Sequence, residues 1–477
     1  MNKSLMEPNA VSTPAEPARS GGRAEESAPA PETLMRACWE VLRVAVPLMV
    51  STGMMSVVLF ADRTMLMRYD GASMSASMAG GNLFWVLVCV PIGAASMTGA
   101  TIGQLIGNRE AHKVGRLLWQ SIWLSLMTIP WFIAAGFLSE MILVAAGQPD
   151  ELIPGASTYM RWLMLGGLGL VIESALSGFF SGTERTSVIM WVSVASGLLN
   201  VLLDILLIFG FAGFPEGGIA GAAIGSVISF WFKVLCYGVI LLLPKFESTY
   251  RIRRGFSFDA AMIRSFLYFS IPSGLMYLTE ASAFTIIVLK IGQLGDIPLR
   301  ATTMAINFNM IAFIPLVGVA IAASVLVGRH LLESGPVFAV RTTMASLLIS
   351  LAYSLVWGGA YLGAGDWMLS LYRWGDPDQA SLSAIDMASG LMIFVASYVL
   401  LDAVQLILAA ALKGAGDTWF VLSAGAVCSL LAVGVGIAFD NQTLTWWWYV
   451  ITAWIWALAV VMAWRFARGR WKSMRMV

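Results

Sequence analysis

Long apolar runs, repeated along almost the whole chain, constrain the fold of this sequence more than any other feature. Hydrophobic residues make up 58% of its 477 residues and charged residues only 12%, and the mean hydropathy is +0.78. A soluble domain usually carries about 25% charged residues, so the composition excludes a soluble enzyme, a nucleic-acid-binding protein and a disulfide-framework protein. Each run is long enough for a helix to cross about 30 Å of hydrocarbon, and a helix satisfies its own backbone groups in lipid. We therefore predict an all-α polytopic membrane protein.

Twelve such runs are predicted to span the membrane, and the segments outside them divide the chain. The predicted spans are 37–62, 77–104, 116–139, 156–181, 186–211, 217–243, 264–292, 299–328, 341–363, 383–412, 418–439 and 443–466. Residues 1–33, rich in Pro, Ala, Ser and Glu, are predicted to form a disordered cytoplasmic tail. Residues 244–263 are predicted to be a cytoplasmic linker between an amino-terminal lobe, 34–243, and a carboxy-terminal lobe, 264–466. A basic cytoplasmic tail, 467–477, follows.

The distribution of Lys and Arg predicts how the helices are oriented. Most of the 29 Lys and Arg residues lie at the helix ends on the same side as both termini, with clusters at Arg251–Arg254 and Arg465–Lys472. An excess of basic residues marks the cytoplasmic side of a membrane protein. Both termini are therefore predicted to be cytoplasmic, in the plasma (inner) membrane of a prokaryote.

The two halves of the sequence resemble each other. One constant spacing pairs Pro47 with Pro272 and Gly93 with Gly318, and several further residues match at this or a similar spacing. Because each half holds six helices, both halves insert in the same orientation, as parallel repeats about an axis along the membrane normal. This predicts twelve transmembrane helices in two pseudo-symmetric six-helix bundles. Transporters are often built this way, whereas channels more often gain symmetry by oligomerising, so we expect a monomer with a substrate path between the bundles.

Four carboxyl groups lie deep within the apolar runs: Asp62, Asp204, Glu280 and Asp402. A charge at the centre of a membrane helix costs about 2.5–3.5 kcal/mol on insertion scales, so such residues usually face a cavity and have a function. Asn200 lies four residues before Asp204, on the same helix face. Burial and a neighbouring carboxylate both favour the protonated form of a carboxyl group, so these groups are candidates to carry a proton. The alternatives are an interfacial position for Asp62, at the end of its run, and buried structural roles for the others.

Two further charges, Glu173 and Lys233, fall in the fourth and sixth predicted helices. They either pair with each other, which offsets the cost of burying each one, or line the substrate path. Alternatively, the long side chain of Lys233 reaches towards an interface.

Two stripes of glycine, at Gly99, Gly103 and Gly107 and at Gly217, Gly221 and Gly225, place small residues on single helix faces. Such faces let helices approach closely in lipid. We therefore interpret both stripes as packing surfaces without chemistry.

No sequence motif indicates catalysis or a cofactor. The chain lacks a phosphate-binding G-x-x-x-x-G-K-[ST] loop, an H-E-x-x-H motif and a G-x-S-x-G motif. Both histidines, His112 and His330, fall in predicted cytoplasmic turns. The four cysteines are far apart and are interpreted as small core residues: Cys38, Cys89, Cys236 and Cys428. We therefore predict neither enzymatic activity, nor a cofactor, nor a nucleic-acid partner.

Several motifs, taken in order, resemble those of the multidrug and toxic compound extrusion (MATE) family, over about residues 36–465. They are Phe60-Ala61-Asp62, the segment Gly197-Leu198-Leu199-Asn200-Val201-Leu202-Leu203-Asp204, Pro272 followed by Glu280, Asp402-Ala403-Val404-Gln405, and Leu412-Lys413-Gly414-Ala415-Gly416-Asp417.

This resemblance implies two bundles in a V shape and the antiport of organic cations or drugs against H⁺ or Na⁺. Family members place an ion-coupling site in the amino-terminal lobe, which matches Asp62, Asn200 and Asp204, or a cation site in the carboxy-terminal lobe, which matches Glu280 and Asp402. The resemblance thus implies H⁺ or Na⁺ as the coupling ion, with Na⁺ held either by Asn200 and Asp204 or by Glu280 and Asp402. The expected partners are small amphipathic cations and the lipid bilayer.

Five residues depart from the family pattern. Arg63 stands where a small polar residue is usual, Thr302-Thr303 replace a common His-Gln pair, Glu173 replaces an uncharged amide, and Lys233 is unexpected. A lysine in the cavity would suit an anionic or zwitterionic cargo.

Three other classes of protein are compatible with parts of this sequence. The first is a flippase for lipid or polysaccharide precursors, whose anionic cargo would need more basic groups than Lys233. The second is a major facilitator-type transporter, but the segment Gly103–Arg109 lacks the Asp expected after the second helix. The third is a membrane-embedded enzyme, against which the missing catalytic groups argue.

Overall fold

A computed structural model describes residues 33–373 and 379–476 of the chain. In these residues the only regular elements are helices, which confirms the predicted all-α class. Eleven helices are long and apolar enough to cross a membrane, and a twelfth span is completed by two shorter helices that meet at a bend of 45°. The predicted disordered tail, 1–33, lies outside the described residues except for Thr33.

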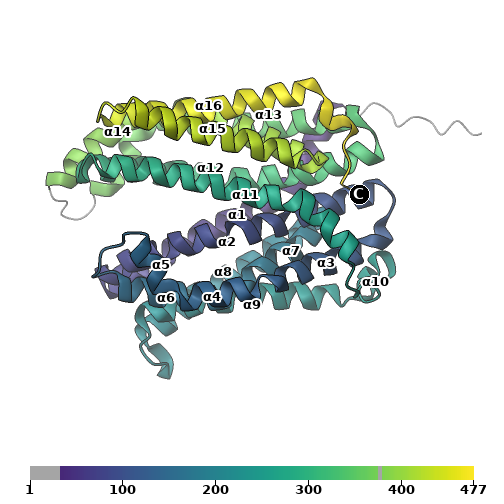
Figure 1. Cartoon of the computed structure of the whole chain (residues 1–477), viewed down its shortest axis with the longest axis horizontal. Coiled ribbons are helices and arrows are strands. Elements are labelled where there is room, and N and C mark those ends of the chain that lie inside the picture. Colours follow the sequence, from purple (N-terminus) through teal and green to yellow (C-terminus); the bar gives the residue numbers. More distant parts are fainter. Residues whose placement is uncertain (1–32, 374–378, 477) are drawn as a thin grey trace, which may run out of the picture. The chain divides into compact units, whose positions relative to one another are not determined.

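The amino-terminal half contains the first six spans, and Figure 1 shows where its helices lie. Its helices are α1 (Leu34–Tyr69), α2 (Gly71–Gly107), α3 (Val114–Met127), α4 (Ile129–Phe137), α5 (Ser139–Ala145), α6 (Ile153–Gly166), α7 (Leu168–Gly182), α8 (Thr186–Phe209) and α9 (Gly218–Leu241), with short 3₁₀ turns at Ala111–Lys113 and Phe211–Gly213. The bent pair is α6 with α7, and the predicted span 116–139 is formed by α3 with α4.

The carboxy-terminal half contains the other six spans and a terminal turn. Its helices are α11 (Ala260–Gly292), α12 (Asp296–Glu333), α13 (Pro336–Ser370), α14 (Gln379–Ala415), α15 (Thr418–Ala438) and α16 (Leu444–Arg468), with 3₁₀ turns at Leu371–Arg373 and η4 (Arg470–Ser473). In the sequence, a short helix, α10 (Pro244–Tyr250), connects the two halves. The next helix, α11, already begins within the predicted linker 244–263.

One predicted boundary is wrong in a way that matters for function. The first span does not end at Asp62, because α1 continues to Tyr69. Asp70 ends this helix and caps the next one, accepting hydrogen bonds from the backbone N–H groups of Ala72 and Ser73. Asp62 therefore lies two turns inside α1, where it is 3% exposed, and the interfacial interpretation of this residue is wrong.

The two halves contact each other through α1 and α2 on one side and α11 and α12 on the other, and the contacts repeat with the predicted symmetry. A Cβ atom on Gly93 would lie 2.5 Å from Cα of Gly274, and one on Gly318 would lie 2.5 Å from the backbone nitrogen of Met49. Small residues let helix backbones touch in this way. The spacing that relates Gly93 to Gly318 also relates Met49 to Gly274, so the two contacts are equivalent.

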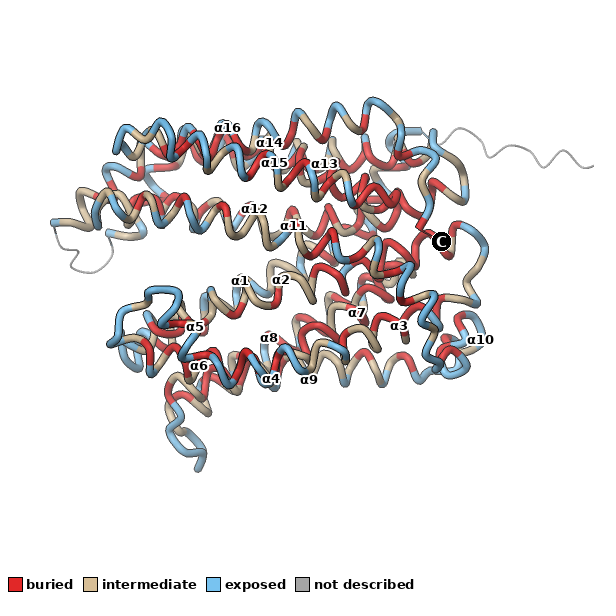
Figure 2. The backbone as a smooth tube through the Cα atoms, viewed as in Figure 1, coloured by how far each residue is buried: buried red, intermediate tan, exposed pale blue. Residues whose placement is uncertain are grey.

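We call the end of the helices that carries residues 100–107, 324–333 and 470–476 the closed end, because the halves are in direct contact there. A Cβ atom on Gly103 of α2 would lie 2.7 Å from the carbonyl oxygen of Val325 of α12. Ion pairs join α12 to other parts of the amino-terminal half: His330 Nε2 lies 3.2 Å from Oε1 of Glu40 on α1, and Arg329 pairs with Glu184 in the turn between α7 and α8. Buried residues gather at this end, whereas the ribbons of the halves are further apart at the other end (Figure 2).

The segment Arg470–Met476 helps to hold the two halves together at the closed end. The Met476 backbone N–H donates to Oε1 of Gln104, 2.8 Å away, and Nε2 of Gln104 donates to the carbonyl oxygen of Gly414, also 2.8 Å away. Gln104 belongs to α2 and Gly414 to α14, so a single buried amide links both halves and the terminal segment. Trp471, which is fully buried, anchors the segment by stacking on Phe466.

Candidate ion-coupling and cargo sites

The acids of the amino-terminal half meet inside their own bundle. Asp62 of α1 interacts with Asp204 of α8 and has Ser226 of α9 and Tyr159 of α6 as further polar neighbours. Asp204 is completely buried, and neither of its carboxylate oxygens has a hydrogen-bond partner. Two facing carboxyl groups without a bound cation are best accommodated when they share a proton, because two adjacent buried carboxylates repel each other.

Asn200 lies one turn before Asp204 on the same face of α8, as predicted, and is 1% exposed. Both its amide nitrogen and its amide oxygen lack a hydrogen-bond partner. A buried polar atom without a partner needs an explanation, and a bound water or ion is one. The structure thus brings Asp62, Asn200 and Asp204 into one polar region.

Gly225 of α9 makes room for this region. A Cβ atom at this position would lie 2.8 Å from Oδ1 of Asp204, and the preceding members of its stripe, Gly217 and Gly221, pack against the backbone of Leu207. The stripe that was interpreted as packing alone therefore also shapes the acidic site.

We expect Gly225→Ala to reduce transport at least tenfold, because the added methyl group displaces the Asp204 carboxyl group from its neighbours. The free energy of unfolding is expected to fall by about 1–3 kcal/mol, the usual cost of overpacking. Dye efflux from cells and thermal unfolding of the purified variant measure the two effects. Gly238→Ala is the matched control, since a Cβ atom at Gly238 of the same helix has nothing within 4 Å; equal efflux by both variants would contradict the prediction.

The carboxy-terminal half has its own acidic region, on α11 and α14. Nε2 of Gln405 donates to Oε1 of Glu280 at 3.4 Å, and Asp402 interacts with Glu280. Lys413 is a cationic neighbour of Glu280 and lies over the ring of Tyr277, 5.0 Å from its centroid. The structure therefore brings Glu280 and Asp402 together, and it adds a lysine that partly balances their charge.

Glu173 and Lys233 face each other across α7 and α9, with Nζ of the lysine 3.9 Å from Oε1 of the glutamate. Their side chains are 13% and 22% exposed. This geometry corresponds to the pairing alternative for these two residues.

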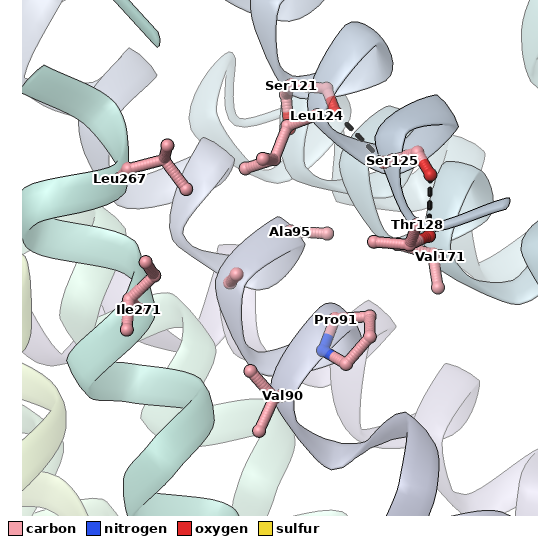
Figure 3. A pocket seen from close by; sticks show the side chains of 11 residues that line it. Val90, Pro91, Ala95, Ser121, Leu124, Ser125, Thr128, Val171, Leu267 and Ile271 are labelled. Carbon is pink, nitrogen blue, oxygen red and sulfur yellow. Dashed lines mark hydrogen bonds between the residues drawn. The ribbon is translucent and has the colours of Figure 1, made fainter. Parts of the chain in front are cut away.

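A cavity of about 120 Å³ lies between the halves but away from all of these charges. It is lined mostly by apolar side chains of α2, α3, α7 and α11 (Figure 3). Its hydroxyl groups all have protein partners: Ser125 donates to the carbonyl oxygen of Ser121, Thr128 donates to that of Ser125, and the Ser121 hydroxyl group bonds to that of Thr98 on α2. No charged side chain lines this cavity.

Three residues of the acidic site in the amino-terminal half were not predicted: Tyr159, Gly225 and Ser226. Ser226 follows a glycine stripe, and this pattern is a usable signal only when the acid on the neighbouring helix is already known. Tyr159 lies in the bent span, and nothing in the sequence relates it to Asp62.

Twelve candidate membrane spans in two related bundles, with acids inside each bundle, define a membrane transporter rather than an enzyme. The profile of the MatE family matches residues 47–206 and 272–438, more than half of the chain. The chain therefore belongs to the MatE family.

Relatives and solved structures agree with this assignment. The chain is 27% identical over 449 residues to the multidrug resistance protein NorM of Burkholderia vietnamiensis, covering 92% of this chain and 96% of that protein. It is 29% identical over 387 residues to the multidrug resistance protein PmpM of Pseudomonas aeruginosa, covering 80% and 79%. The crystal structure of the eukaryotic MATE transporter AtDTX14 superposes with a TM-score of 0.82 at 20% identity, over 92% of this chain and 97% of that chain, and so has the same fold.

Proposed function

We propose that this protein is a secondary active antiporter that exports small amphipathic organic cations in exchange for protons by alternating access. One observation carries the proposal: Asp62 and Asp204 face each other, both buried, with three of their four carboxylate oxygens unpaired. Such a pair binds and releases a proton with little rearrangement. The printed names of the relatives, multidrug resistance proteins, support a broad range of cargo.

Glu280 and Asp402 are proposed to attract the cargo. They are only partly buried, unlike Asp204, and they present two carboxyl groups against one lysine. A net negative site favours an organic cation, whereas Lys413 limits the attraction and helps the cargo to leave.

The protein is proposed to work as a monomer in the bacterial inner membrane, with both termini and the closed end on the cytoplasmic side. The cluster of basic residues at this end supports the orientation. The proton then enters from outside, and each positive charge that moves inward gains about 2.3 kcal/mol per 100 mV.

The test is the movement of a cationic dye across vesicles that contain the purified protein, with proton and sodium gradients imposed separately. We expect the proton gradient alone to drive the dye against its concentration gradient. Transport driven by the sodium gradient alone would reject proton coupling, and equal movement without any gradient would reject antiport. Vesicles without protein are the control.

A further inference from the structure

The polar residues of the amino-terminal bundle continue beyond the acidic site towards the closed end. On α8, Ser193, Ser196, Asn200 and Asp204 follow one another at spacings of three or four residues, and on α9 so do Ser226, Ser229, Lys233 and Tyr237. Residues at these spacings share one helix face, and the two faces lie against each other, because Ser196 donates its hydroxyl hydrogen to the Ser229 carbonyl oxygen at 3.0 Å. The two faces extend over roughly 16 Å of helix.

The end of these faces nearer the closed end holds the Glu173–Lys233 pair. Tyr237 connects this pair to α8, since Glu173 and Ser193 are polar neighbours of its hydroxyl group. The tyrosine is completely buried, and its hydroxyl group has no hydrogen-bond partner. Ser193 is in turn bonded to Ser51 of α1, with their oxygens 2.6 Å apart.

The polar residues on the facing sides of α8 and α9 form a row. Each end of this row therefore holds a carboxyl group, and each end contains buried polar atoms without partners. These are Asp204 and Asn200 at one end and Tyr237 at the other. A structural ion pair alone does not require an unpaired tyrosine beside it, because a phenylalanine would fill the space without an orphaned hydroxyl group.

We propose that the facing polar sides of α8 and α9 carry the coupling proton from the Asp62–Asp204 pair to Glu173. Glu173 is then a second proton acceptor, and Lys233 holds its side chain in place. This inference rests on the proposed function, because it takes proton antiport as given and assigns the route by which the proton leaves. The ion pair by itself gives Glu173 and Lys233 no part in moving the coupling ion.

The transfer is balanced. The O–H bond of the protonated Asp204 breaks and its carboxylate forms, while the carboxylate of Glu173 gains one O–H bond and becomes neutral. Water molecules and hydroxyl groups between them each accept one proton and pass one on. Lys233 keeps its charge throughout, and Glu173 then gives the proton to water on the side of the closed end.

In the conformation described here the row is interrupted. The Ser196 and Ser229 hydroxyl groups both donate to backbone carbonyl oxygens, those of Ser229 and Gly225, at 3.0 and 2.9 Å. A hydroxyl group that donates to a carbonyl oxygen does not pass a proton along the row. This interruption keeps protons from leaking through the bundle in this conformation.

The experiment compares variants of the full-length protein in vesicles that enclose a pH-sensitive dye. With an imposed proton gradient, Glu173→Gln is expected to slow proton release into the vesicle at least tenfold. Its affinity for a cationic dye, and the dependence of that affinity on pH, are expected to stay unchanged, because Asp62 and Asp204 still bind the proton. If Glu173→Gln released protons at the same rate as the wild-type protein, the proposal would be overturned.

The double variant Glu173→Leu/Lys233→Leu separates this role from a structural one. Replacing both members of an ion pair inside a protein by apolar residues is often neutral for stability, so a purely structural pair predicts release at the wild-type rate. The proposal predicts that release stays at least tenfold slower, and recovery in the double variant would overturn it.

Tyr237→Phe gives a third measurement that does not disturb the ion pair. It removes only an unpaired hydroxyl group and is expected to slow proton release several-fold without loss of thermal stability. Tyr361→Phe is the matched control in the other half, where the hydroxyl group donates to the Phe308 carbonyl oxygen at 3.0 Å. Equal release by the two variants would contradict the route.

Failure of the two proposals can be told apart. If the wild-type protein shows no exchange driven by a proton gradient, the proposed function fails, and this inference fails with it. If the wild type exchanges protons and all variants of this route match it, only the inference is wrong.

Discussion

Asp204→Asn is expected to abolish export driven by a proton gradient, with efflux at least a hundredfold below that of the wild type. Asparagine has nearly the same shape as aspartate but takes up no proton in this pH range, so the variant keeps the packing and loses the exchange. The asparagine amide group can still exchange a hydrogen bond with the facing Asp62, so that this neighbour is not left without a polar partner. Removing a buried ionisable group also spares its desolvation cost, so expression and thermal stability are expected to be unchanged.

The measurement is dye efflux from cells together with thermal unfolding of the purified protein. Asp150→Asn is the matched control, because Asp150 is exposed and lies outside the helices. Efflux at the wild-type level by Asp204→Asn would reject its coupling role. If Asp402→Asn instead removed the dependence on the proton gradient, the carboxy-terminal half would carry the coupling.

Gly103→Val is expected to drive the closed end apart. A Cβ atom on Gly103 would lie 2.7 Å from the Val325 carbonyl oxygen, a backbone atom that does not rotate out of the way. Overpacking of this kind costs about 1–3 kcal/mol, and it penalises only the state in which the halves touch at this end. The population of that state is expected to fall roughly 5- to 150-fold relative to states with the closed end open.

A thiol-reactive reagent measures this shift. In a background without the four native cysteines, a cysteine replacing the fully buried Ala322 is expected to react much faster when Gly103→Val is present. Gly53→Val is the matched control, since a Cβ atom at Gly53 meets nothing within 4 Å. Unchanged labelling with Gly103→Val would show that the contact does not hold the closed end together.

The arrangement of spans was predictable because it depends on local properties. Apolar run length and the repeated Pro47–Pro272 and Gly93–Gly318 spacing define twelve helices in two bundles before any contact is known. The helix end at Asp62 was wrong because an acid in an apolar run looks like a boundary, whereas here Asp204, Ser226 and Tyr159 provide polar neighbours that keep it inside the bundle.

The rest of the site depends on how helices are rotated and shifted against each other. The proximity of Gly225 to Asp204 follows from the register of α9 on α8, which no local pattern specifies. The same limit applies to the terminal segment: its basic residues predict a solvated tail, but Trp471 and Met476 are buried against the halves. Two apolar side chains among several charges are too weak a signal to predict docking.

Gln104 bonds to both the terminal segment and the other half, and these bonds link the opening of the closed end to the entry of water. Its amide group is completely buried, and both of its ends are bonded, one to Met476 and one to Gly414. When the halves separate, these bonds break, and each buried polar group left alone costs about 1–3 kcal/mol. Water must therefore enter as the segment lifts, so opening and hydration of this interface form a single step. Solutes that are excluded from protein surfaces, such as sucrose, favour buried states. We therefore expect them to slow the opening of this interface and with it the transport cycle.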